Sequence, residues 1–194
     1  MSSSHFYLES ENKKMTPAEY GYWLVRWSHD GAMGSVDDLK ASRYSVAPIV
    51  KTILKESFAA YLHYLAIYIA SYWFYASIIL NAQEATQLEM KRGLDDGIKS
   101  LRNGADPFDA RLVQYLRGAI SVYMKAAIDD YDSKIDSAIY NPDINSVGKK
   151  HIEMMSQYYD NMTEIDRFTL GHFVADTPAG IFKSMRDEFK LKLR

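Results

Sequence analysis

The feature that most constrains this chain is a run of 27 residues, Ser57 to Gln83, with no charged side chain when histidine is counted as neutral. A helix that is apolar on every side is either the centre of a bundle or a membrane span. Five tyrosines recur through the run at steps of 3, 4, 4 and 3 and share one helix face: Tyr61, Tyr64, Tyr68, Tyr72 and Tyr75. Membrane tyrosines prefer the interfaces, whereas a protein core can offer each hydroxyl a partner. We therefore expect a buried central helix, with a membrane-inserting segment at 57–83 as the alternative.

Helix start signals recur along the chain. Thr16 and Glu19 form a capping box around a proline, and Asp106 and Thr177 each precede a proline in the same way. No segment alternates between apolar and polar residues for more than a few positions, so we expect no sheet. The sequence predicts an all-α fold, a single bundle of about five to seven helices around a central helix at roughly 49–81.

The domain organisation follows from composition. Residues 1–14 are polar and aperiodic and are expected to form a flexible N-terminal tail. Residues 15–194 are expected to form one α-helical domain, because no linker or repeat divides them. Within it we expect one continuous helix from 146 to 170, and a last helix that begins at Thr177 and runs to the C-terminus.

Glycines and polar clusters suggest the other helix boundaries. Gly31 is expected to end the first helix, and Ser35 to begin a short second one. The central helix should break near residues 81–84, where the apolar run stops. Gly93 and Gly97 are expected to interrupt the polar helix that follows.

Composition excludes several classes of function. The chain has no cysteine, which excludes disulfides, thiolate metal sites and a catalytic cysteine. Its formal net charge is −2, so we expect no general attraction to nucleic acid. The first residues lack the features of a secretory signal, and a cytoplasmic location is therefore expected.

The histidines form no metal motif. None of the five lies three to five residues from another, so no HExxH or HxxxH pair exists. His63 lies on the alanine-rich face of the uncharged run and is the only histidine that we expect to be buried. With the five tyrosines of that run it is our candidate for a ligand pocket, although a hydrogen-bonded core histidine is the favoured interpretation.

One acidic cluster is a weak metal candidate. Asp129, Asp132 and Asp136 lie at steps of three and four and share a helix face. The glycine and glutamate of an EF-hand loop are missing, so a solvated acidic face is favoured. We expect no metal and no cofactor.

Two segments are candidates for an interaction surface. Trp23 and Trp27 lie on the aromatic first helix. The last helix should present a cationic stripe beside an apolar one, with the cations Lys183, Arg186, Lys190 and Arg194. The simpler interpretation is an amphipathic helix that closes the bundle.

The sequence contains no recognisable set of catalytic residues. It is rich in tyrosine, methionine and tryptophan, which are residue types that interfaces favour. We therefore expect a non-enzymatic helical interaction protein, such as an adaptor, inhibitor, immunity-type protein or accessory subunit, with a protein partner or a homo-oligomer. One alternative is a membrane-active helical protein that uses residues 57–83. The other is a helical enzyme or ligand carrier with a pocket lined by tyrosine and histidine.

Overall fold

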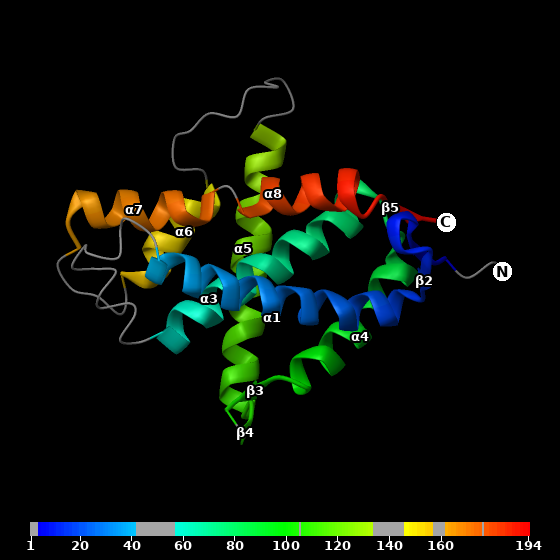
Figure 1. Ribbon diagram of the computed structural model, residues 1–194, viewed down its shortest axis with the longest axis horizontal. Helices are drawn as coiled ribbons and strands as arrows, with labels where there is room; N and C mark the ends of the chain where they lie inside the picture. The colour runs from blue at the N-terminus through cyan, green and yellow to red at the C-terminus, as the bar shows by residue number, and fades with distance from the viewer. Residues whose placement is uncertain (1–3, 42–56, 105, 134–145, 157–161, 176) are drawn as a thin grey trace.

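The protein is a bundle of helices with a small sheet at one end. The computed structural model describes residues 4–41, 57–104, 106–133, 146–156, 162–175 and 177–194. Its α-helices are α1 (Pro17–Ala41), α3 (Ser57–Phe74), α4 (Glu84–Lys99), α5 (Ala110–Ser133), α6 (Ser146–Met155), α7 (Glu164–Ala175) and α8 (Thr177–Lys183). Figure 1 shows α5 running across the direction of α1 and α8. The predicted all-α multi-helix bundle is confirmed.

Helix α3 is the centre of the bundle and packs against α1, α5 and α8. Length and a mean hydropathy of 1.3 would also allow Phe58–Ile79 to cross a membrane, yet 72% of the apolar window in it is buried by protein. The helix continues as a π-helix over Tyr75–Ile79, Asn81 takes a positive φ of 52°, and α4 begins at Glu84. The expected break near residues 81–84 is therefore confirmed, whereas the expected start near 49 lies outside the described residues.

The N-terminal residues form a sheet with the C-terminus. The antiparallel order is β2-β1-β5, with β1 at Phe6–Leu8, β2 at Lys13–Met15 and β5 at Leu191–Leu193. Phe6 and Leu8 are fully buried, and the Phe6 ring stacks on Tyr20 at 4.1 Å between centroids. The two ends of the chain lie side by side (Figure 1), joined by His5 N–H donating to the Arg194 carbonyl at 2.7 Å.

The expectation of a flexible tail over residues 1–14 is therefore wrong for the residues from 6 onward, and so is the expectation of no sheet. Strands of three residues are too short to show an alternating pattern, and one of the two pairing partners of β1, strand β5, lies at the other end of the chain. A second, two-stranded pair joins β3 (Arg102–Asn103) to β4 (Asp106–Pro107).

Glycines mark close approaches between helices rather than helix ends. Helix α1 passes Gly31 and Ser35 without a break, and α4 passes Gly93 and Gly97 in the same way, so these four expectations are wrong. A Cβ atom on Gly93 would lie 1.8 Å from the carbonyl oxygen of Ala18. The glycines of α4 thus allow its backbone to touch that of α1.

Of two predicted helix N-caps, one is confirmed and the other lies at a different residue. The Thr16 backbone N–H donates to Glu19 Oε2 at 2.7 Å, and the Glu19 N–H donates to Thr16 Oγ1 at 3.2 Å, which is the predicted capping box. Asp106 lies in β4 instead of starting a helix. Asp109 caps α5, because its Oδ1 accepts from the Leu112 N–H at 2.8 Å.

The expected continuous helix 146–170 is two helices in the structure, α6 and α7. A capping box of Thr163 and Asp166 begins α7, with the Thr163 N–H donating to Asp166 Oδ2 at 2.9 Å. Helix α7 continues past Gly171, and α8 begins at Thr177 as predicted.

Candidate functional site

A buried polar network joins α3, α5 and α6. Nδ1 of His63 lies 3.1 Å from the phenol oxygen of Tyr123, and that oxygen lies 3.1 Å from Nδ1 of His151. The Tyr115 hydroxyl is 2.9 Å from Nε2 of His63. His63, Tyr123 and His151 are fully buried. The predicted core position of His63 is thereby found, with hydrogen bonds on both ring nitrogens.

Burial keeps this network uncharged. It lowers the pKa of His63 to about 4 and that of His151 well below its ordinary value, and it raises the pKa of Tyr123. Nε2 of His151 has no hydrogen-bond partner among the described residues. A neutral imidazole and a phenol can each donate and accept a hydrogen bond. The donor and acceptor roles along this network can therefore run in either direction.

Sequence reasoning missed His151. A signal was present, because Val147, His151 and Met155 follow one another at steps of four, which is an apolar helical seam containing one histidine. All three residues are buried.

All five tyrosines of the uncharged run pack against protein. The Tyr61 hydroxyl lies 2.7 Å from Nδ1 of His29, and the Tyr68 hydroxyl lies 3.2 Å from Oγ of Ser35, both on α1. The ring of Tyr64 packs on His151, with centroids 5.6 Å apart.

The last two tyrosines differ from each other. Tyr72 packs against Trp27 at 5.9 Å between centroids, and its backbone carbonyl accepts from the Tyr20 hydroxyl at 3.2 Å. Tyr75, in the π-helix, lines a pocket near the C-terminus. Tyr75 packs on Phe182, at 5.8 Å between centroids, and also borders this pocket.

A separate groove of about 400 Å³ lies between α3, α4 and α5. Its lining residues are Trp73, Lys91, Leu94, Asp95, Arg117, Ile120, Ser121 and Met124. The apolar members are buried or half-buried, whereas Lys91, Arg117 and Ser121 are exposed. The groove, as this set of residues is called below, thus has an apolar interior and a polar rim.

The rim carries an excess of positive charge. Arg117 Nη2 donates to Asp95 Oδ1 at 2.7 Å, which links α5 to α4. Lys91 forms no ion pair with a described residue, so one positive charge remains uncompensated. Leu88, one helical turn before Lys91, is 56% exposed.

The two tryptophans predicted for an interaction surface differ in exposure. Trp23 is 38% exposed, and the Lys13 ammonium lies 4.0 Å from its ring centroid. Trp27 is half-buried and packs on Phe189 at 6.4 Å between centroids.

The cationic stripe expected on the last helix is wrong. After α8 a π-helix ends at Glu188, Lys190 takes a φ of 49°, and strand β5 follows. All four cations are exposed, but Lys190 lies after the helical segment and Arg194 follows β5, where it pairs with Glu9. Strand pairing with β1 overrides the helical pattern that the sequence continues.

The acidic cluster also takes a different role. Asp129 is exposed, while Asp136 and the side chain of Asp132 lie outside the described residues. Among the residues that the structure describes, no group of three or more His, Asp or Glu is placed to hold a metal ion. Asp130 instead caps α6, because its carboxylate accepts from the backbone N–H of Ser146 at 2.9 Å.

Comparison of the chain with protein-family models, with curated proteins and with solved structures gives no match. The class that the geometry defines is an all-α bundle with a buried histidine–tyrosine network and an open apolar groove. A function is inferred from these two features alone.

Proposed function

We propose that the protein is a non-enzymatic interaction protein that binds a partner protein in the groove between α3, α4 and α5. The observation that carries the proposal is the groove itself, with apolar side chains inside and charged side chains at its rim. An apolar centre within a polar rim is the usual anatomy of an interface. Tryptophan and arginine, which the groove contributes as Trp73 and Arg117, are the residue types most enriched at binding hot spots.

The rim indicates the chemistry of the partner. Lys91 and Arg117 carry two positive charges and Asp95 carries one negative charge, so the lining has a net charge of +1. A carboxylate on the partner would meet Lys91, which forms no ion pair within the described residues. The occupant is therefore a segment that inserts a large apolar side chain and carries an aspartate or glutamate beside it. Leu88 extends the apolar contact along α4.

The alternatives have less support. A general acid or base must reach its substrate, whereas His63 and His151 are fully buried. Neither imidazole lines the groove or the Tyr75 pocket. The membrane alternative requires α3 to leave its packing against α1, α5 and α8.

Photo-crosslinking from the rim tests the proposal. The full chain would carry p-benzoylphenylalanine at Ser121, which is exposed at the groove, and would be irradiated in a lysate of its own source cells. We expect one discrete adduct whose crosslinked peptide contains a large apolar residue next to an acidic one. The adduct should be lost with Lys91→Glu.

The matched control places the same photo-reactive residue at Lys149, which is exposed on α6 and does not line the groove. An adduct of equal yield from this position would overturn the proposal. The same holds if Lys91→Glu leaves the Ser121 adduct unchanged, or if the captured peptides share no apolar and acidic residues.

A further inference from the structure

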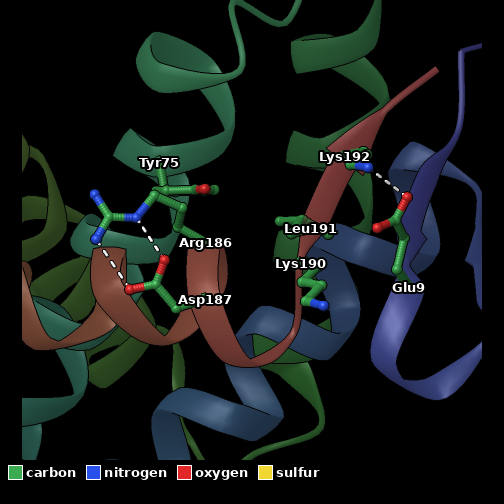
Figure 2. A pocket seen from close by; sticks show the side chains of 7 residues that line it. All are labelled: Glu9, Tyr75, Arg186, Asp187, Lys190, Leu191 and Lys192. Atoms are coloured by element: carbon green, nitrogen blue, oxygen red, sulfur yellow. Dashed lines mark hydrogen bonds and ion pairs between the residues drawn. The ribbon is translucent and has the colours of Figure 1, made fainter.

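We propose that a second site, which shares no lining residue with the groove, binds a small oxyanion of the phosphate type. It is a pocket of about 430 Å³ where the end of α3, the C-terminal π-helix and the sheet meet (Figure 2). Its lining residues are Glu9, Tyr75, Arg186, Asp187, Lys190, Leu191 and Lys192. Three of them are cations and two are carboxylates, so the lining has a net charge of +1.

The carboxylates neutralise specific cations and leave one without a partner. Nζ of Lys192 pairs with Glu9, and both guanidinium atoms Nε and Nη2 of Arg186 pair with Asp187, at 2.7 and 2.9 Å. Figure 2 shows these two ion pairs on opposite sides of the pocket. Lys190 forms no ion pair with a described residue. Its ammonium is thus the charge that an incoming anion would meet.

Tyr75 supplies an uncharged donor from the inner side of the pocket. The residue is only 4% exposed, and its hydroxyl, which forms no hydrogen bond with a described residue, is reached by solvent in the pocket. Burial raises the pKa of Tyr75, so the hydroxyl keeps its proton at neutral pH. A hydroxyl at the wall of the pocket can donate to a bound anion, and a hydrogen bond to a charged acceptor is stronger than one to a neutral acceptor.

The backbone holds Lys190 beside the pocket in an unfavourable conformation. Its φ of 49° lies in the left-handed region, which residues other than glycine and asparagine rarely adopt. The turn is fixed on both sides of Phe189, whose N–H donates to the Ser184 carbonyl at 2.9 Å and whose carbonyl accepts from Ser10 Oγ at 3.3 Å. Backbone strain of this kind concentrates at functional sites.

Lys190→Gly separates the role of the charge from the role of the fold. Glycine adopts the left-handed conformation without steric cost, so this variant removes the cation and keeps the turn. The probe is inorganic phosphate, added to the full-length protein and followed by two-dimensional ¹H–¹⁵N NMR. We expect saturable shifts centred on Tyr75 and on residues 190–192. The Kd should rise about tenfold in Lys190→Gly, the loss expected for one charged hydrogen bond.

Two further variants complete the test. Tyr75→Phe removes only the hydroxyl and should raise the Kd for phosphate severalfold. Lys99→Ala removes the same charge from the end of α4, which does not line the pocket, and should leave the Kd unchanged. An equal rise of the Kd for phosphate in Lys99→Ala and Lys190→Gly would mean that the protein attracts phosphate by its general charge, and would overturn the proposed site. The absence of saturable shifts in the wild type would overturn it as well.

Flotation with vesicles that contain phosphatidic acid distinguishes the source of the phosphate. If the wild type floats and Lys190→Gly does not, the site takes a lipid headgroup. If the wild type binds free phosphate but does not float, the ligand is a soluble phosphorylated molecule.

Discussion

Nδ1 of His63 on α3 lies 3.1 Å from the phenol oxygen of Tyr123 on α5, and both side chains are fully buried. The contact ties the central helix to the helix that crosses it (Figure 1). It depends on a neutral imidazole, because burial opposes the charged form and lowers the pKa of His63 to about 4. The stability of the fold is therefore linked to pH.

The free energy of unfolding should fall as the pH is lowered from 6.5 toward about 4. The unfolded chain protonates His63 near the ordinary pKa of 6.5, whereas the folded chain does so only near 4. The unfolded state thus binds more protons in this window, and stability rises with pH across it. His63 alone accounts for a loss of about 3 kcal/mol, and His151 adds to it. Urea unfolding at a series of pH values measures the slope.

A double variant tests the origin of that slope. His63→Gln combined with His151→Gln should flatten the pH dependence within the window. His172→Gln changes a half-exposed histidine on α7 and should leave the dependence as it is. If the double variant keeps the wild-type slope, the buried network is not its source.

The contact between α1 and α4 predicts opposite effects for two glycine substitutions. Gly93→Ala should destabilise the fold by about 2–4 kcal/mol, because the new Cβ would overlap the carbonyl oxygen of Ala18 and force the helices apart. Gly118→Ala is its control, since Gly118 is exposed in α5 with no atom near the new Cβ. That substitution should stabilise the fold by about 0.5–1 kcal/mol. Thermal unfolding of both variants measures these changes. An equal change in stability for the two variants would contradict the close approach of α1 and α4.

The N-terminal strand should contribute to global stability. Phe6→Ala removes a fully buried ring that stacks on Tyr20, and a loss of about 3–5 kcal/mol is expected. Lys14→Ala, at an exposed position of β2, should change stability by less than about 0.5 kcal/mol. Denaturant unfolding distinguishes the two variants. A Phe6→Ala variant as stable as the wild type would instead support the expectation of a flexible N-terminal tail.

Two neighbouring aspartates should differ in their effect on α6. Asp130→Ala removes the acceptor for the backbone N–H groups of Ser146 and Val147, which should cost about 1 kcal/mol. Asp129→Ala changes an exposed carboxylate and should be close to neutral. Comparison of the two unfolding midpoints is the measurement. Equal losses would argue against the cap.

The parts of the fold that sequence predicts are those set by local chemistry. The capping box of Thr16 and Glu19 involves residues three positions apart, and the uncharged run contains its own evidence of burial. The sheet pairs Phe6 with Leu193, and no local pattern reports a partner so distant in the chain. Glycine is ambiguous for the same reason, because Gly93 signals a helix end unless the backbone of Ala18 is known to lie against it.

The groove was not predicted because its residues come from three helices. Trp73 belongs to the uncharged run, which the sequence predicts as a buried central helix, whereas Leu94 belongs to α4 and Met124 to α5. Only the packing of α3, α4 and α5 brings them together. Residues on one helix face can be grouped from sequence, whereas a site between helices requires the tertiary arrangement.

The most direct test of the proposed function is the affinity of the full-length protein for the segment that crosslinks to position 121. Ser121→Trp would place a bulky ring at the exposed rim of the groove, and Lys149→Trp would add the same ring on α6. Titration calorimetry should give a Kd at least about tenfold higher for Ser121→Trp and an unchanged Kd for Lys149→Trp. Equal Kd values for the wild type and Ser121→Trp would contradict binding in the groove.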